Sequence, residues 1–282
     1  GPRAGAGEAA SGAPVPASAP VEGGQAHAGG ARGAIRFEDV SFRYPGTERW
    51  ALRHLSLEVP AGQSLALVGH NGAGKTTFIK LLTGLYAPSE GRVTIDGVDV
   101  RSLPEEARYR RFAVVFQDFV ELQTSLRDNV GFGSVEHLAD EARLRRATDR
   151  GGADRLIARL EDGLDSQLGR HFERGVELSG GEWQSVALSR SFMREEAEVL
   201  VLDEPTSALD AQAEHALFER FRELTRGRTS ILVSHRFPTV RMADRIVVVD
   251  GGQIVEEGTH DELTRANGRY ARLFALQAEG YR

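Results

Sequence analysis

Two hydrophobic patterns divide the folded part of the chain. Apolar and polar positions alternate near its start, which predicts strands with one buried face at Ile35–Glu38, Val40–Tyr44 and Leu55–Val59. Two further strands flank Asp96-Gly97, a pair that favours a type I′ hairpin turn. These segments predict an antiparallel β subdomain at the front of the domain.

The later strands are continuous apolar runs instead, as expected for parallel strands buried on both faces. They are Ser64–Val68, Val199–Leu202, Ser230–Val233 and Ile246–Val249. Between them, residues 125–159 show apolar positions at three-to-four spacing, which is typical of helices. We therefore expect an α/β fold with a parallel sheet, an N-terminal antiparallel β subdomain and an inserted helical subdomain at about 118–190.

Residues 1–33 differ from the rest. Gly, Ala and Pro occupy 23 of these 33 positions, without apolar periodicity. Such a segment buries too little surface to offset its ordering entropy, so we predict a flexible linker or tail. The folded domain is expected over residues 34–282.

Composition removes several classes of function. The net charge of −6 gives no global attraction to nucleic acid or anionic lipid. The absence of cysteine excludes a disulfide framework and thiol chemistry. The sequence contains neither an apolar run of about 20 residues nor a secretory signal pattern.

The clearest chemical motif is a glycine-rich loop of nine residues. Gly69-His70-Asn71-Gly72-Ala73-Gly74-Lys75-Thr76-Thr77 matches G-x-x-x-x-G-K-[ST] in full, after an expected strand and before an expected helix. Its backbone N–H groups can surround phosphate oxygens at the positive end of that helix. Lys75 can reach the β- and γ-phosphates, and the Thr76 hydroxyl can bind Mg²⁺.

A second motif delivers two acids at the end of a strand. Asp203 and Glu204 follow the apolar run Val199–Leu202, at the edge where open parallel sheets bind ligands. Asp203 is a candidate for holding Mg²⁺ through a water molecule, and Glu204 is a candidate general base for an attacking water. The alternative is an acidic pair that only ends a strand and caps a helix.

A third loop, Leu178–Glu182, precedes an expected helix that ends near Arg194. Ser179 can cap this helix, and the N–H groups of Gly180 and Gly181 form a second anion site. A helix of about 12 residues is about 18 Å long, so this site should lie far from Asp203 of the same chain. Either the loop serves a second chain in a head-to-tail pair, or it is an ordinary helix cap.

Together these motifs resemble the nucleotide-binding domain of ATP-binding-cassette (ABC) transporters over residues 34–281. Gly69–Thr77 resembles Walker A, Leu178–Glu182 the signature loop, Val199–Glu204 Walker B and Ser207–Asp210 the D-loop. The resemblance implies ATP and Mg²⁺ as ligands and ATP hydrolysis as the activity. Phosphate contacts are then expected from Gly69, Asn71, Gly72, Gly74, Lys75, Thr76, Thr77, Ser179, Gly180 and Gly181.

The resemblance also assigns three single residues. Tyr44 resembles the aromatic residue that stacks on adenine, although it could be a core tyrosine at a strand end. Gln117 resembles the Q-loop residue near Mg²⁺ and the attacking water, or it is a solvated loop residue. His235 resembles the switch histidine at the γ-phosphate, or it caps a helix. With Lys75 and Glu204, Gln117 and His235 complete the expected catalytic set.

Several features match the exporter branch of the family. They include Ser125–Val130, the segment 257–263 and the segment 270–274. The signature loop ends in Glu182 where the family most often has Gln, and the preceding loop is shorter than usual. The resemblance implies two partners. One is a transmembrane domain on the same polypeptide, and the other is a second cassette, identical or different. It implies a location at the cytoplasmic face of the plasma membrane.

Two other classes of ABC protein are considered. Soluble ABC ATPases that act on nucleic acid or ribosomes usually carry two cassettes or a long coiled-coil insertion, and this sequence has neither. Its negative charge also disfavours a nucleic acid partner. Regulatory cassettes without turnover typically lack the residues that correspond to Glu204 and His235, which are present here.

Overall fold

A computed structural model describes residues 32–204, 225, 228–234 and 236–280. Its strands are β1 Ile35–Phe42, β2 Leu52–Val59, β3 Ser64–Val68, β4 Glu90–Ile95, β5 Val98–Asp99, β6 Phe112–Val115, β7 Val199–Asp203, β8 Thr229–Val233, β9 Arg245–Asp250 and β10 Gln253–Gly258. Its α-helices are α1 Lys75–Leu82, α2 Glu105–Arg110, α3 Leu126–Gly131, α4 Glu141–Gly151, α5 Asp154–Arg159, α6 Gly180–Phe192, α8 Phe237–Val240, α9 His260–Ala266 and α10 Arg269–Gly280. None of the helices in this part of the chain has the length and apolar character that a bilayer span requires.

The N-terminal strands form an antiparallel sheet in the order β2-β1-β4-β5, as the alternating pattern predicts. The two alternating segments on either side of Asp39 form one continuous strand, β1. Asp39 has a φ of 46°, and the pairing with β2 shifts register between Phe37 and Val40. A bulge of this kind interrupts the alternation while the strand continues. The β4–β5 turn has positive φ at both Asp96 and Gly97, which confirms the type I′ geometry.

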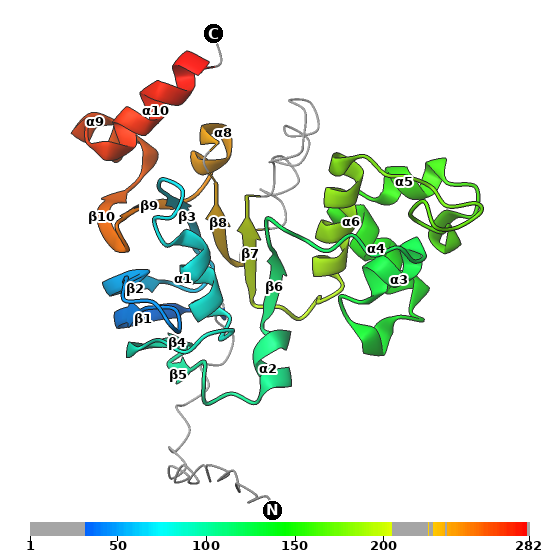
Figure 1. Cartoon of the computed structure of the whole chain (residues 1–282), viewed down its shortest axis with the longest axis horizontal. Helices are drawn as coiled ribbons and strands as arrows, with labels where there is room; N and C mark the ends of the chain where they lie inside the picture. Colours follow the sequence, from blue (N-terminus) through cyan, green and yellow to red (C-terminus); the bar gives the residue numbers. More distant parts are fainter. Residues whose placement is uncertain (1–31, 205–224, 226–227, 235, 281–282) are drawn as a thin grey trace, which may run out of the picture. The chain divides into compact units, whose positions relative to one another are not determined.

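The second sheet has the order β10-β9-β3-β8-β7-β6 (Figure 1). Strands β9, β3, β8, β7 and β6 pair in parallel, and only β10 runs antiparallel to its neighbour. All five residues of β3, β7 and β8 are buried, which explains why these strands read as unbroken apolar runs. The carboxyl ends of β3, β6 and β7 therefore lie at one edge, where the candidate residues follow each strand.

Three apolar cores hold these elements. The largest joins the antiparallel sheet to one face of the parallel sheet through α1, and Phe37 stacks on Phe78 with ring centroids 4.1 Å apart. A second core packs the helices between residues 126 and 192 against β6 and β7. The third lies between β3, β9 and the C-terminal helices, where Tyr270 is fully buried.

The helical region departs from its sequence pattern at one arginine. Arg143 lies on α4 among interleaved arginines and acids, a pattern that predicts a solvated helix face, but it is only 5% exposed. Its Nε donates to the Met193 carbonyl at 2.8 Å and its Nη2 to Glu196 at 2.7 Å. The buried guanidinium thus ties α4 to the end of α6, a partner that local charge patterning could not reveal. The proposed linker at 1–33 lies almost entirely outside the described residues.

Candidate nucleotide site

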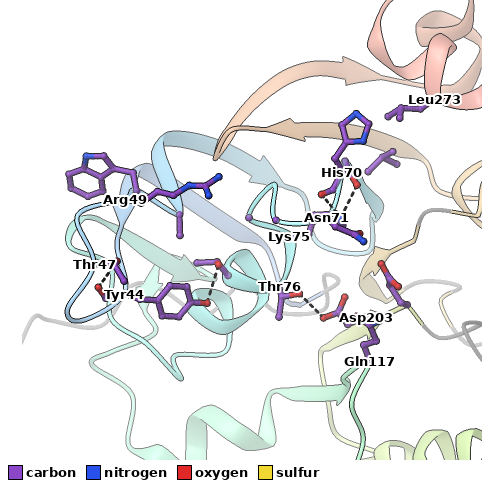
Figure 2. A pocket seen from close by; sticks show the side chains of 18 of the residues that line it. Tyr44, Thr47, Arg49, His70, Asn71, Lys75, Thr76, Gln117, Asp203 and Leu273 are labelled. Carbon is purple, nitrogen blue, oxygen red and sulfur yellow. Dashed lines mark hydrogen bonds between the residues drawn. The ribbon is translucent and has the colours of Figure 1, made fainter.

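A cavity of about 1020 Å³ opens at the carboxyl edge of the parallel sheet (Figure 2). It is lined by Tyr44, Thr47, Arg49, Trp50, Ala51, Val68, Gly69, His70, Asn71, Gly72, Gly74, Lys75, Thr76, Thr77, Gln117, Asp203, Glu204, Leu273 and Leu276. The structure therefore brings together the glycine-rich loop, the acidic pair, Tyr44 and Gln117. The volume suits a ligand of nucleotide size.

The glycine-rich loop joins β3 to α1 and depends on its glycines. Gly72 and Gly74 have φ angles of 79° and 111°, which residues with a side chain rarely adopt. Gly69 has a different constraint, since a Cβ atom there would lie 2.3 Å from the Val249 carbonyl oxygen. The loop can therefore curve closely against β9 and turn its N–H groups inward, as a phosphate site requires.

Lys75 begins α1 and folds back over this loop. Its Nζ donates to the carbonyl oxygens of Gly69 at 2.8 Å and His70 at 3.0 Å. Burial lowers the pKa of Lys75, while the nearby carboxylates of Glu204 and Asp203 oppose that effect. The ammonium group is thus held where an incoming phosphate can replace two backbone carbonyls as its partner.

Thr76 and Asp203 meet across the cavity. The Thr76 hydroxyl donates to Asp203 Oδ2 at 3.2 Å. Asp203 is 2% exposed at the end of β7, and burial raises its pKa to about 6. The carboxylate of Glu204 also raises the pKa of Asp203, whereas the Thr76 hydrogen bond and the charge of Lys75 lower it. A bound cation would favour the ionised form of this carboxyl group.

The protein oxygens in the cavity suit a Mg²⁺ ion that is also bound by substrate phosphates, rather than an ion held by protein side chains alone. Among the described residues, no three His, Cys, Asp or Glu side chains cluster as a metal site. A hydroxyl and a buried carboxylate lie within hydrogen-bond distance, and Gln117 lines the same cavity. Mg²⁺ typically takes one or two protein oxygens together with phosphate oxygens and water.

Glu204 has a backbone conformation that its sequence context does not reveal. Its φ is 49°, in the left-handed region that residues other than glycine seldom occupy. Its N–H donates to the Val233 carbonyl at 2.8 Å, which ties the end of β7 to the end of β8. Unusual backbone of this kind clusters at functional sites, and here it turns the chain at the cavity wall.

Tyr44 lines the cavity, and its hydroxyl lies 3.1 Å from the Thr77 hydroxyl (Figure 2). Its ring makes edge contacts with Phe42 and Tyr86, and Lys80 Nζ lies 5.6 Å from the ring centroid. The ring is thus partly buried in an aromatic cluster while it borders the nucleotide site. This position fits a tyrosine packed in the core, and it also places the ring where a ligand in the cavity could contact it.

The Leu178–Glu182 loop is not part of this cavity. Ser179 caps α6, and a full capping box joins its backbone and side chain to Glu182. The Glu182 carboxylate also pairs with Arg159 of α5. Ser179 and Gly180 are exposed and Gly181 is half-buried, so the start of α6 is open to solvent.

Two expected components cannot be placed. His235 and the segment Ser207–Asp210 lie outside the described residues. The cavity also contains residues that no motif indicated, including Arg49 and Trp50 near Tyr44 and Leu273 and Leu276 on α10. For Arg49 and Trp50, the only sequence signal for a place in the site was their position in the same loop as Tyr44. The leucines come from the far end of the chain and only the fold brings them there.

Comparisons with known proteins agree with this architecture. Residues 52–207 match the family model described as ABC transporter. The chain is 40% identical over 240 residues to the subtilin transport ATP-binding protein SpaT of Bacillus subtilis, covering 85% of this chain and 39% of that protein. It is 41% identical over 249 residues to the β-(1→2)glucan export ATP-binding/permease protein NdvA of Rhizobium etli, covering 88% and 41% of the two chains.

A solved structure shares the fold as well. A bacterial Atm1-family ABC exporter with ATP bound superposes with a TM-score of 0.79 at 36% identity, over 88% of this chain and 42% of that chain. The chain thus spans about two fifths of the length of the relatives that it matches.

Proposed function

This chain belongs to the ABC transporter family, and we propose that it is the domain of an exporter that binds and hydrolyses ATP. The observation that carries the proposal is the meeting of Lys75, Thr76, Asp203 and Glu204 in one cavity of nucleotide size. The exporter branch is supported by the relatives, which include a glucan export protein and an Atm1-family exporter.

The glycine-rich loop and Lys75 would bind the ATP phosphates. The N–H groups of the loop and the start of α1 supply donors and partial positive charge without a side chain. Lys75 Nζ would exchange the Gly69 and His70 carbonyls for β- and γ-phosphate oxygens. Tyr44 would contact the adenine through the part of its ring that faces the cavity.

Thr76, Asp203 and Gln117 would hold Mg²⁺. When bound, the ion neutralises charge on the β- and γ-phosphates. Thr76 Oγ1 and Asp203 Oδ2 lie 3.2 Å apart, so both oxygens are available where the ion would bind. Asp203 must be ionised for this role, which its raised pKa allows at neutral pH.

Glu204 would act as the general base. Its carboxylate would accept a proton from water as the water oxygen attacks the γ-phosphorus and the bond to the β-phosphate oxygen breaks. The products are ADP and inorganic phosphate. The unusual backbone at Glu204 and its link to β8 would fix the carboxylate position during this step. His235 is proposed to contact the γ-phosphate on the basis of the sequence alone.

A second cassette would complete the site. The exposed N-terminal end of α6 presents Ser179, Gly180 and Gly181 away from the cavity of its own chain. In a head-to-tail pair it would instead reach the γ-phosphate on the partner chain, with helix N–H groups as donors. The ion pair with Arg159 compensates the charge of Glu182, which would otherwise repel the phosphate.

The transmembrane domain would dock on an apolar groove beside α6. This groove of about 450 Å³ is lined in part by Leu85, Val120 and Phe132, which are 47%, 60% and 45% exposed. A helical segment from the remaining length of an ATP-binding/permease protein would bury these side chains. The cassette would then work at the cytoplasmic face of the plasma membrane.

The docking surface can be tested in the full-length transporter. Phe132→Asp should abolish transport because it places a charge in an apolar interface, while ATP affinity stays unchanged. Val135→Asp is the control, since Val135 is 64% exposed but lies outside the groove. Normal transport by the Phe132 variant would refute this surface.

The central experiment measures ATP hydrolysis against protein concentration for the wild type and Glu204→Gln. We expect specific activity to rise with concentration, because the site needs two chains. The substitution should lower turnover by about 10²–10⁴-fold while ATP binding persists. Glu161→Gln, at an exposed acid outside the cavity, should retain full activity. A flat activity per mole together with a Glu204 variant that keeps most turnover would disprove both the shared site and the base.

The nucleic acid alternative has no observation in its favour. The net charge is −6, and the reported relatives are transport and export proteins.

A further inference from the structure

The loop between β1 and β2 forms one side of the cavity mouth and has a defined shape. A turn closes where the Thr47 N–H donates to the Tyr44 carbonyl at 3.1 Å and the Thr47 hydroxyl donates to the same oxygen at 2.9 Å. The Ala51 N–H then donates to the Phe42 carbonyl at 2.8 Å. The loop therefore holds Arg49 at a fixed position along the cavity.

This loop touches the phosphate-binding loop directly after Arg49. A Cβ atom on Gly74 would lie 2.7 Å from the Ala51 carbonyl oxygen and 2.6 Å from Leu52 Cδ2. Gly74 also precedes Lys75, which is the family's phosphate-binding lysine. Arg49 is thus two residues from a backbone contact with the phosphate loop, and Figure 2 shows its side chain extending toward that loop.

Arg49 is also free to bind a ligand. In the part of the chain that the structure describes, its side chain has neither a hydrogen bond nor an ion pair. The adjacent acid, Glu48, faces Arg43 at 4.0 Å instead, and the Arg43 guanidinium lies 5.2 Å from the Trp50 ring centroid. The other cation that lines the cavity, Lys75, is engaged with two loop carbonyls.

We propose that Arg49 is a further phosphate-binding residue, whose guanidinium binds the α- and β-phosphate oxygens of a nucleoside di- or triphosphate. This inference rests on the proposed ATP function. An arginine presents paired N–H donors that match phosphate oxygens, and charge-assisted bonds of this kind are stronger than neutral ones. Because the Arg49 side chain is exposed, it can fold over the phosphates of a bound nucleotide.

The test is calorimetric titration of the whole chain with ATP, ADP and adenosine in the presence of Mg²⁺. Arg49→Gln should weaken ATP and ADP binding about tenfold, as expected for one charge-assisted contact. Adenosine binding should not change, because the base and ribose keep their contacts. Arg49→Lys should recover part of the loss, since it restores the charge without the paired donors.

Arg53→Gln is the matched control. Arg53 is an exposed arginine on β2, four residues further along, and its side chain does not line the cavity. The Arg53→Gln substitution removes the same positive charge at a solvent-exposed position outside the cavity. Because salt screens such a charge, the substitution should change ATP affinity by less than about twofold. Thermal unfolding of each variant checks that the fold is unchanged.

Two results would overturn the inference. Equal ATP affinity in the Arg49→Gln and Arg53→Gln variants would show that Arg49 makes no phosphate contact. An equal loss for adenosine and ATP would show that Arg49 acts on the base or on the loop shape. Both results leave the proposed ATPase intact, whereas a wild-type chain that binds no ATP would remove the ATPase proposal and this inference together.

Discussion

The Thr76 hydroxyl donates to Asp203 Oδ2 at 3.2 Å although the two residues are 127 positions apart in the chain. One residue lies at the start of α1 and the other at the end of β7, and β3 and β7 are separated by β8 in the sheet. The contact therefore depends on the order of three parallel strands. It places the two proposed Mg²⁺ ligands together before any ligand is bound.

Because Asp203 is buried, we expect the free energy of unfolding to depend on pH. Its pKa is raised from 3.8 to about 6, so the folded chain holds a proton between these values that the unfolded chain releases. Stability should therefore fall as pH rises from about 4 to about 6 and then level off, with a total cost of about 3 kcal/mol at most. Asp203→Asn keeps an acceptor for Thr76 without the charge.

We expect Asp203→Asn to be about 2–3 kcal/mol more stable than the wild type at pH 7.5 without nucleotide, and under about 1 kcal/mol more stable at pH 4. Urea unfolding at both pH values measures this. Asp149→Asn, at an exposed acid on α4, should give no such trend. A variant that is less stable than the wild type at pH 7.5 would contradict the burial argument.

The two glycines at the phosphate loop should respond differently to alanine. Gly69→Ala brings a Cβ atom to 2.3 Å from the Val249 carbonyl, so the loop or β9 must move. Gly72→Ala meets no atom within 4 Å and incurs only the strain of its φ of 79°, about 1–2 kcal/mol. Gly69→Ala should therefore unfold at a lower temperature and bind ATP at least tenfold more weakly than Gly72→Ala. Equal behaviour of the two variants would show that the close approach to β9 is not limiting.

Arg143 and Arg145 provide a test of burial on the same helix. Arg143→Ala removes a buried guanidinium from the Met193 carbonyl and Glu196, which should cost about 2–3 kcal/mol of the free energy of unfolding. Arg145 pairs with Glu141 on the surface, so Arg145→Ala should change stability by less than about 0.5 kcal/mol. Chemical denaturation compares the two, and a loss of similar size in both would argue against the structural role of Arg143.

Local sequence patterns are enough to predict the glycine-rich loop and the buried strands. Continuous apolar runs at β3, β7 and β8 can only be stable where both faces are buried, so a parallel sheet followed from them. The glycines before Lys75 allow the positive φ angles that the loop adopts at Gly72 and Gly74. They also allow the backbone to approach a ligand closely, as a phosphate site requires. Asp96-Gly97 likewise predicts its type I′ turn from local sequence, because both residues tolerate positive φ angles.

Which distant groups meet depends on the three-dimensional arrangement of the elements. The bulge at Asp39, the burial of Arg143 and the contact of Ala51 with Gly74 all depend on partners remote in sequence. Local patterns encode the preference of a segment for solvent or core, but they carry no information on which other segment supplies the contact. The raised pKa of Asp203 and the backbone conformation of Glu204 follow from such contacts. Both properties therefore depend on the order of the strands in the sheet.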